Sequence, residues 1–211
     1  MDEELVEDLK SKLKNEFSNY YEVAGGKNYR YYHLETSHKI AKNLTQELEV
    51  EVDQKVVEIA ALFHDIGRVE DIENGQMNPF DGHEGHDKRG ADLVSDYISE
   101  HVTSKQLKKI QNIILNHHSN PETVEGKIIQ DADNISNFGV NNLWRQFHYA
   151  SDNDRNLNES LKYFWETAVK DYKAQIKMMN FDYSRKVAKK RLDKQKEAFK
   201  NIEEEMNAED L

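Results

Sequence analysis

AALFHDIGR, residues 60–68, combines an apolar run with two side chains that can bind a metal ion. Adjacent residues on a helix point about 100° apart, so His64 and Asp65 can reach one ion together only near a helix end or bend. Gly67 follows two residues after Asp65, as a glycine commonly does where a helix ends. We therefore predict that a packed helix ends here and that other candidate ligands are brought to this point.

The composition favours a mostly helical protein. The 211 residues are 37% hydrophobic and 33% charged, with only 2 prolines and 9 glycines. A net charge of −11 does not attract nucleic acid or an anionic membrane, so we expect neither as a partner. The same charge repels anionic substrates at long range. A phosphorylated substrate would therefore need local positive charge or metal at the site.

The absence of cysteine restricts the possible metal chemistry. Disulfides and thiolate sites are excluded, so a metal must be bound by His, Asp, Glu or water. No apolar run approaches the roughly 18 residues of a membrane span. The acidic N-terminus, MDEELVEDL, lacks the basic and apolar regions of a signal peptide. We therefore expect a cytoplasmic protein.

Helical periodicity is clear in the first part of the chain. Apolar residues at positions 5, 9, 13 and 17 form one stripe, and a second stripe lies between positions 37 and 48. His33 lies one turn before the second stripe and is expected on its buried face. His38 falls off that stripe and is expected at the surface. Asp53 is expected to cap the next helix, which leads into His64.

The middle of the chain is predicted to alternate between helices and one long loop. Residues 68–85 have no helical period and are expected to form that loop. His86 is expected to open the next helix, and His117 to end the helix after it. An acidic cluster at residues 130–134 begins within a further helical turn.

Two long helices are predicted near the C-terminus, at residues 159–178 and 183–205. They have too little apolar surface to fold alone. We therefore predict a single all-α domain over residues 1–211. Its core spans about residues 28–150, and a C-terminal helical extension, about residues 151–211, packs against it.

Six polar side chains are predicted at the ends or inner faces of separate helices. They are His33, His64, Asp65, His86, His117 and Asp133. Burying them without partners would be very unfavourable, so they either form a hydrogen-bonded core network or surround metal. Their nitrogen and oxygen atoms suit Mn, Fe, Co, Ni and Zn, with Mg less suited. With Asp65 as a bridge, they could hold one or two divalent transition metal ions.

The order H…HD…D and its local contexts resemble a known family. The segments YYHLETSHKIAKNL, AALFHDIGR and IIQDADNIS are similar to the HD superfamily of metal-dependent phosphohydrolases, over roughly residues 28–145. The C-terminal run NFDYSRKVAKKRLDKQKEAF resembles the tail helix of small bacterial and archaeal members. The resemblance implies an all-α HD domain that hydrolyses a phosphoester or phosphoanhydride, often in a nucleotide. It also implies that Asp133, and not Asp131, is the ligand in the acidic cluster.

Two further segments resemble the ligand positions of members that bind two metals. These are HDKRGADLV, with His86, and IILNHHSN, where either His117 or His118 could be the ligand. No GYP sequence follows the histidine pair, so the cyclic-dinucleotide branch is not supported. Glu70 and Asp71 are displaced from the spacing of guanosine-tetraphosphate hydrolases. The substrate is expected to be a nucleotide or another small phosphorylated metabolite, and its identity stays open, as does the oligomeric state.

Three residues are predicted to act on the substrate. Asp65 would hold the metal, while Arg68 and Lys88 could bind phosphate. Arg68 could instead form a salt bridge to Glu70 or Asp71, and Lys88 could lie on a solvated face.

The aromatic residues and the function class both admit alternatives. The rings of Tyr31, Tyr32, Trp144 and Phe147 could stack on a base, but core packing is favoured. Besides a hydrolase, the sequence allows a non-catalytic, metal-dependent nucleotide sensor on the same fold. It also allows an interaction protein that recruits a partner through its C-terminal helices.

Overall fold

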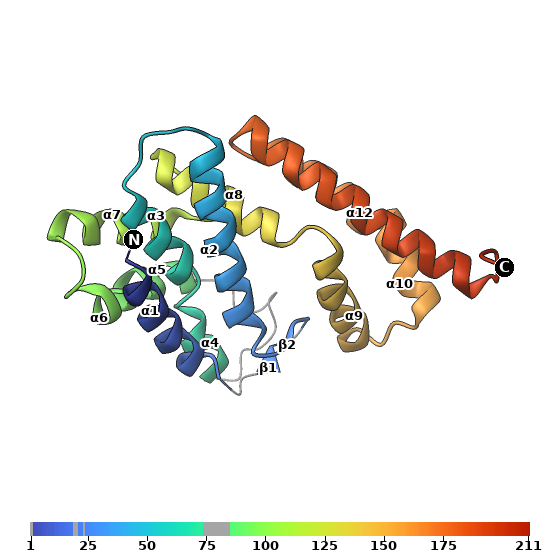
Figure 1. The fold of residues 1–211 in the computed structure, drawn as a ribbon. Coiled ribbons are helices and arrows are strands. Elements are labelled where there is room, and N and C mark those ends of the chain that lie inside the picture. Colours follow the sequence, from blue (N-terminus) through green and yellow to red (C-terminus); the bar gives the residue numbers. More distant parts are fainter. Residues whose placement is uncertain (1, 19–20, 23, 74–84) are drawn as a thin grey trace.

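The computed structural model describes residues 2–18, 21–22, 24–73 and 85–211, and its fold is all-α (Figure 1). The elements, in chain order, are α1 (Glu3–Glu16), β1 (Tyr21–Glu22), β2 (Gly26–Lys27), α2 (Tyr29–Glu47), α3 (Gln54–Phe63), α4 (Arg68–Glu73), α5 (His86–Leu93), α6 (Ser95–Ile98), α7 (Ser104–Asn116), α8 (Val124–Ser136), η1 (Val140–Asn142), α9 (Leu143–Asp152), α10 (Leu157–Tyr163), η2 (Phe164–Ala168), α11 (Val169–Met178) and α12 (Asp182–Met206). The two short strands pair antiparallel, with Tyr21 opposite Lys27.

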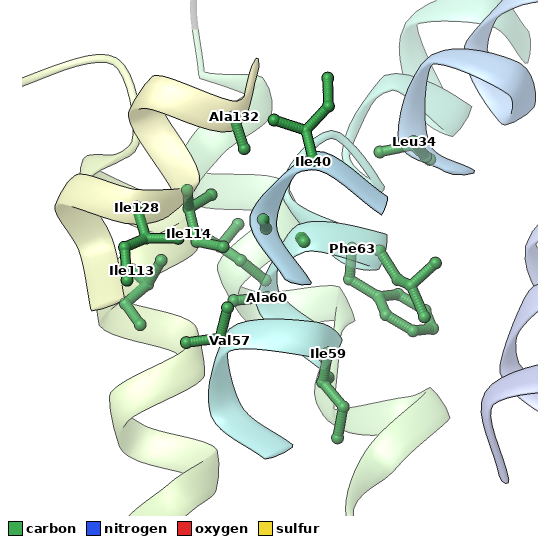
Figure 2. Close-up of a cluster of buried hydrophobic side chains, with 14 of the residues drawn as sticks. Leu34, Ile40, Val57, Ile59, Ala60, Phe63, Ile113, Ile114, Ile128 and Ala132 are labelled. Carbon is green, nitrogen blue, oxygen red and sulfur yellow. The ribbon is translucent and has the colours of Figure 1, made fainter. Parts of the chain in front are cut away.

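Helix α3 lies at the centre of the fold, as its apolar sequence predicts. Every residue from Val56 to Phe63 is buried, and α3 packs against α2, α7 and α8. The side chain of Asp53 caps its N-terminus by accepting hydrogen bonds from the backbone N–H groups of Lys55 and Val56, which confirms the predicted N-cap. Figure 2 shows the isoleucines of α7 and α8 meeting α3 in this core. A rigid base therefore lies directly behind the His64-Asp65 pair.

A second, smaller cluster holds the C-terminal helices together. The rings of Phe164 and Phe199 stack with centroids 3.7 Å apart, and Leu161, Ala168 and Val169 are buried around them. Helix α12 begins beside α8, runs to this cluster and ends far from α1 (Figure 1). The predicted pair of long C-terminal helices is present, but the first is interrupted by η2, a π-helical segment.

Several sequence expectations were wrong. His38 is buried, not exposed, because α2 is covered by α1, α3 and α8, so its buried face is wider than one stripe. The predicted loop 68–85 begins with α4, and its residues 74–84, including His83, lie outside the described residues. Tyr32, Trp144 and Phe147 are 56%, 59% and 41% exposed, so core packing does not explain these rings.

Within the described residues, no helix is long and apolar enough to cross a membrane.

Candidate metal centre

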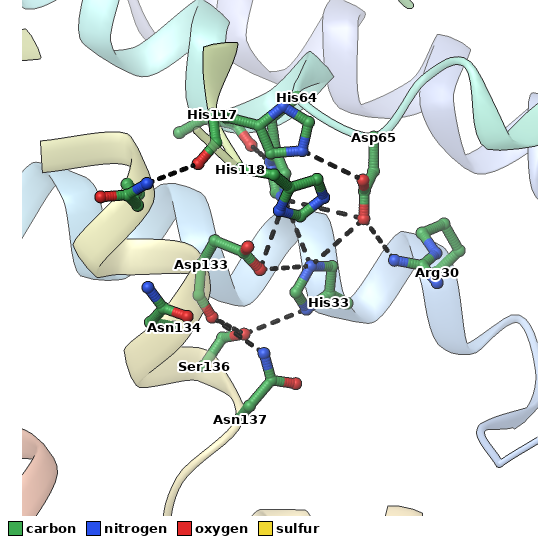
Figure 3. Close-up of polar contacts among 12 residues, drawn as sticks. Arg30, His33, His64, Asp65, His117, His118, Asp133, Asn134, Ser136 and Asn137 are labelled. Atoms are coloured by element: carbon green, nitrogen blue, oxygen red, sulfur yellow. Dashed lines mark hydrogen bonds and ion pairs between the residues drawn. The ribbon is translucent and has the colours of Figure 1, made fainter. Parts of the chain in front are cut away.

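All six predicted ligands converge on one point of the fold, from five helices or helix ends, and Figure 3 shows five of these side chains. His33 comes from α2, His86 opens α5, and Asp133 lies in α8. His64 is the C-cap of α3 and His117 the C-cap of α7. Asp65 follows His64 directly, where the chain leaves α3. The expected convergence at this helix end is therefore confirmed.

Gly67 makes this convergence possible through close approach of two backbones. A Cβ atom at Gly67 would lie 2.0 Å from the carbonyl oxygen of His86 and 2.6 Å from the backbone nitrogen of Gly90. Any side chain there would push α5 away from the end of α3. Glycine at position 67 thus lets the first turn of α5 bring His86 beside Asp65.

Asp65 lies between two groups of histidines and offers one carboxylate oxygen to each. Its Oδ1 is 3.3 Å from His86 Nε2 and 3.6 Å from His117 Nε2. Its Oδ2 is 3.6 Å from His33 Nε2 and 3.8 Å from His64 Nε2. This is the geometry of a carboxylate that bridges two neighbouring cations.

The two histidine groups are each compact enough for one ion. On one side, His33 Nε2 is 3.2 Å from both His64 Nε2 and Asp133 Oδ1. On the other side, His86 Nε2 is 3.2 Å from His118 Nε2. Ligands about 2.1 Å from a tetrahedral ion are about 3.4 Å from each other, so these separations match a metal site. Both His117 and His118 lie in the second group, so the structure leaves both of them as candidate ligands.

The tautomers of three histidines are set by their outer nitrogens. The Nδ1 atoms of His64 and His117 lie 2.9 Å and 2.5 Å from backbone carbonyl oxygens of Ala61 and Ile114, which only accept hydrogen bonds. In the neutral imidazoles, which are the forms that bind a metal, these Nδ1 atoms therefore carry the proton and each Nε2 lone pair points inward.

The tautomer of His33 is fixed in the same way, by the hydroxyl group of Ser136. Ser136 donates its single proton to the Asp133 carbonyl oxygen at 2.7 Å, so its Oγ accepts from His33 Nδ1 at 3.0 Å. The Nε2 lone pairs of His33 and His64 therefore face each other and a carboxylate. Among the described residues, Asp65 Oδ1 and His117 Nε2 are buried without a hydrogen-bond partner. Inward lone pairs and buried acceptors without a hydrogen-bond donor are the groups that a bound cation would satisfy.

Charges around the centre keep its carboxylates ionised. Burial alone would raise the pKa of Asp65, but Arg30 and His64 outweigh burial and hold this pKa well below its ordinary value. Burial would likewise raise the pKa of Asp133, yet His33 and His64 hold it well below its ordinary value. Both groups are thus ready to bind a cation without first losing a proton.

The two histidines of the first group respond differently to their surroundings. Burial lowers the pKa of His33, against the raising effect of Asp133. Burial also acts to lower the pKa of His64, but Asp65 and Asp133 outweigh it, so this pKa is raised.

Arg30 is a site residue that the sequence analysis missed. Its guanidinium is hydrogen-bonded to Asp65 on one side and to Glu22 of the β1–β2 hairpin on the other. Burial disfavours the charged guanidinium, but Glu22 and Asp65 together raise its pKa above the ordinary value. Its position three residues before His33 places it on the same face of α2, which is the one signal that could have identified it.

The two predicted phosphate-binding residues differ in position. Arg68 is buried beside the centre and donates a hydrogen bond to Asp71 at 3.2 Å, which is the alternative salt bridge that the sequence allowed. Burial lowers the pKa of Arg68. Lys88 lies on the exposed face of α5, as the solvated alternative predicts. Arg68 lines the pocket described next, and Lys88 is not among the described residues that line it.

A cavity of about 340 Å³ opens onto the centre, a volume within the range of small-molecule sites. Its inner end is lined by Arg30, Arg68, His33, Asp65 and Asp133. The remaining lining side chains are mostly phenols, amides and one further arginine from the C-terminal half of the chain. They are His118, Asn137, Asn142, Arg145, Gln146, Tyr149, Tyr163, Tyr172 and Gln175, with Ala24 from the hairpin.

The two aspartates of the acidic cluster on α8 have different partners: Asp133 contacts the histidines of the centre, and Asp131 contacts the C-terminal helices. Asp131 is fully buried and accepts hydrogen bonds from the backbone N–H groups of Asn180 and Phe181, between α11 and α12. Asp133 faces the histidines. Asn134 accepts a hydrogen bond from Gln175 of α11 at 2.6 Å. Asp131 is therefore occupied structurally, which agrees with Asp133 as the candidate ligand.

The comparison with protein families identifies the class of this protein. The HD domain model matches residues 30–137, just over half of the chain. The chain therefore belongs to the HD domain family, and in general terms it is a metal-dependent phosphohydrolase of that superfamily. The matched region contains all six predicted ligands. A search of curated proteins gave no match.

Alignments with solved structures of the same fold cover nearly the whole chain. An HD-superfamily hydrolase from Bacillus thuringiensis aligns with a TM-score of 0.68 at 24% identity, covering 97% of this chain and 98% of that one. A predicted HD-superfamily hydrolase from an uncultured Thermotogales bacterium gives 0.67 at 19%, covering 95% and 92%. YpgQ from Bacillus subtilis, in complex with ADP, gives 0.64 at 19%, covering 95% and 97%. These similarities show that the C-terminal helices recur in the same fold.

Proposed function

We propose that this protein hydrolyses a phosphoester or phosphoanhydride bond of a nucleotide with two divalent transition metal ions. One ion would be held by His33, His64, Asp65 and Asp133. The other would be held by Asp65, His86 and His117, with His118 as a further ligand. Mn, Fe, Co, Ni and Zn suit these nitrogen and oxygen donors.

The observation that carries this proposal is the position of Asp65 between two inward-facing groups of histidines. A hydrogen-bonded core network is the alternative, but it would need protons between the facing nitrogen atoms. The outer hydrogen bonds of His64 and His117 leave both inward Nε2 atoms as acceptors. When bound, divalent ions at such a site would lower the pKa of a water ligand and polarise phosphoryl oxygens.

The chain's own residues would bind and orient the phosphate group. Arg68 lines the cavity beside Asp65 and is held by Asp71, so its guanidinium is a suitable ligand for a phosphoryl oxygen. Arg30 lines the same wall and fixes the bridging carboxylate of Asp65. Together they supply the local positive charge that an acidic protein needs for an anionic substrate.

Two observations support a nucleotide as the substrate. The cavity has arginines near the centre and the rings of Tyr149 and Tyr163 among its lining residues, which suits a phosphate joined to an aromatic base. The structurally similar YpgQ was determined in complex with ADP.

The test is metal content followed by hydrolysis. Elemental analysis of gently purified full-length protein should give about two ions per chain, with fewer in His64→Ala and in His86→Ala. His101→Ala, a histidine outside the centre, is the matched control. Nucleoside mono-, di- and triphosphates would then be assayed with Mn or Fe, and both ligand variants should lose more than about 100-fold in activity.

Other results would change the assignment. One ion that is lost only in His64→Ala would leave a single-metal site and assign His86 to substrate binding. No uptake of Mn, Fe, Co, Ni or Zn would overturn the proposal. Stoichiometric metal and nucleotide binding without turnover would favour a sensor on the same fold.

A further inference from the structure

The wall of the cavity opposite the metal ligands comes from α9, α10 and α11, after the segment that the HD domain model matches. Tyr172 of α11 occupies a special place in this wall. It lines the cavity at the centre and also a neighbouring cavity of about 880 Å³, and both cavities include His118 and Asp133. The phenol therefore lies where two openings meet beside the candidate ligands.

The hydroxyl group of Tyr172 is held by two amide donors. Asn142 Nδ2 and Gln146 Nε2 each donate a hydrogen bond to its oxygen at 2.6 Å. A phenolic oxygen that accepts two hydrogen bonds has used its acceptor capacity, and its O–H remains a donor. The surroundings thus fix the chemical role of the group: it can only donate, and it borders a cavity built to receive an anion.

The position of Tyr172 is fixed by one contact of its ring and by two contacts that tie α11 to α8. It packs against Phe138, with ring centroids 5.0 Å apart. One turn further along α11, Gln175 donates to Asn134, the residue that follows Asp133 on α8. The end of α11 is tied to Asp131 through Asn180. Helix α8 therefore carries a candidate ligand and, through its neighbours, sets the distance of Tyr172 from that ligand.

We propose that Tyr172 is a substrate-binding residue that donates its hydroxyl proton in a hydrogen bond to an oxygen of the phosphorylated substrate, and that Asn142 and Gln146 position it as a donor. This inference rests on the proposed hydrolase function and deepens it. It assigns substrate selection to the C-terminal helices, while the HD segment holds the metal. Arg30 and Arg68 would contact the substrate from the opposite wall.

The first test is Tyr172→Phe, which removes the hydroxyl and keeps the ring against Phe138. Loss of a hydrogen bond to a charged group should lower kcat/KM for the preferred nucleotide by about 10- to 100-fold. The affinity for a methylene-bridged nucleotide analogue, measured by calorimetry, should fall in the same direction. Metal content and Tm should stay at wild-type values. Tyr183→Phe, an exposed tyrosine of α12 that lines neither cavity, is the matched control and should change none of these quantities.

A double-mutant cycle tests the positioning role. Gln146→Leu should lower kcat/KM several-fold when Tyr172 is present and should have no further effect in the Tyr172→Phe background. Full additivity of the two changes would overturn the assigned role of Gln146. Wild-type kcat/KM and analogue affinity in Tyr172→Phe would overturn the whole inference. That result, in a wild type that is active with two ions, would leave the proposed function intact. A wild type that takes up no metal and is inactive would overturn both.

Discussion

The core around α3 and the C-terminal helices differ in how they are built and in what they contribute. The core buries a continuous set of Ile, Leu, Val and Ala side chains, and helix ends on its surface converge at Asp65. The C-terminal cluster has five buried hydrophobic residues, centred on the stacked rings of Phe164 and Phe199. The core thus gives the rigidity that a metal site requires, while the C-terminal helices supply the wall to which we assign substrate binding.

The sharpest way to test this comparison is to remove one buried ring from each region. Phe63→Ala should lower the free energy of unfolding by about 3–5 kcal/mol, because it leaves a cavity in the central helix next to His64. Phe199→Ala should cost less, because the smaller cluster can relax, and it should lower nucleotide affinity while metal content stays unchanged. Denaturant unfolding and elemental analysis measure both effects.

Equal losses of stability, with loss of metal in both variants, would contradict this division.

A smaller effect is expected at the junction of the two regions. Ser136 lies at the end of α8 and accepts a hydrogen bond from His33 Nδ1. Ser136→Ala should therefore lower the affinity for the metal ion beside His33 by about 10- to 100-fold. The other ion, beside His86 and His117, should keep its affinity. Metal titration followed by competition with a chelator measures the two affinities separately. Ser119→Ala, an exposed serine after α7, is the control, and equal weakening of both ions would contradict the two-group description.

The metal side of the site was predictable from sequence because its residues lie at helix ends with clear periodicity. Apolar stripes placed His33 on a buried face, and Gly67 marked the end of the helix that carries His64. The structure adds a different reason for Gly67, which is the backbone contact with His86. His38 was misplaced because a single stripe does not reveal how many neighbours a helix has.

The substrate side was not predictable, because its contacts join distant parts of the chain. Asn142 and Tyr172 are separated by 30 residues, and Gln146 and Tyr172 by 26. No local pattern identifies such partners. A lone tyrosine on a C-terminal helix is most simply explained by packing, and only the two amide donors around its hydroxyl indicate another role.

The smallest predicted effect concerns pH and compares a buried carboxylate of the core with an exposed one of the C-terminal helices. Glu58 of α3 is hydrogen-bonded to His38 at 3.2 Å and to Gln54 at 3.1 Å. Burial alone would raise its pKa, but favourable interactions, of which the hydrogen bond to His38 is the largest, outweigh burial and lower the pKa from 4.5 to about 2. Because the folded pKa is depressed, the stabilisation is complete above about pH 4.5 and is lost as the pH falls towards 2.

Between pH 5 and pH 3, the free energy of unfolding should therefore fall more steeply in the wild type than in Glu58→Gln. Asp193→Asn removes an exposed carboxylate of α12 that pairs with Lys196 and should leave the slope of the wild type unchanged. Urea unfolding of metal-free protein at several pH values measures both slopes without interference from metal release. Identical slopes in the wild type and Glu58→Gln would show that the His38–Glu58 pair contributes nothing to acid sensitivity, and the distinction between buried and exposed carboxylates would then not hold for this protein.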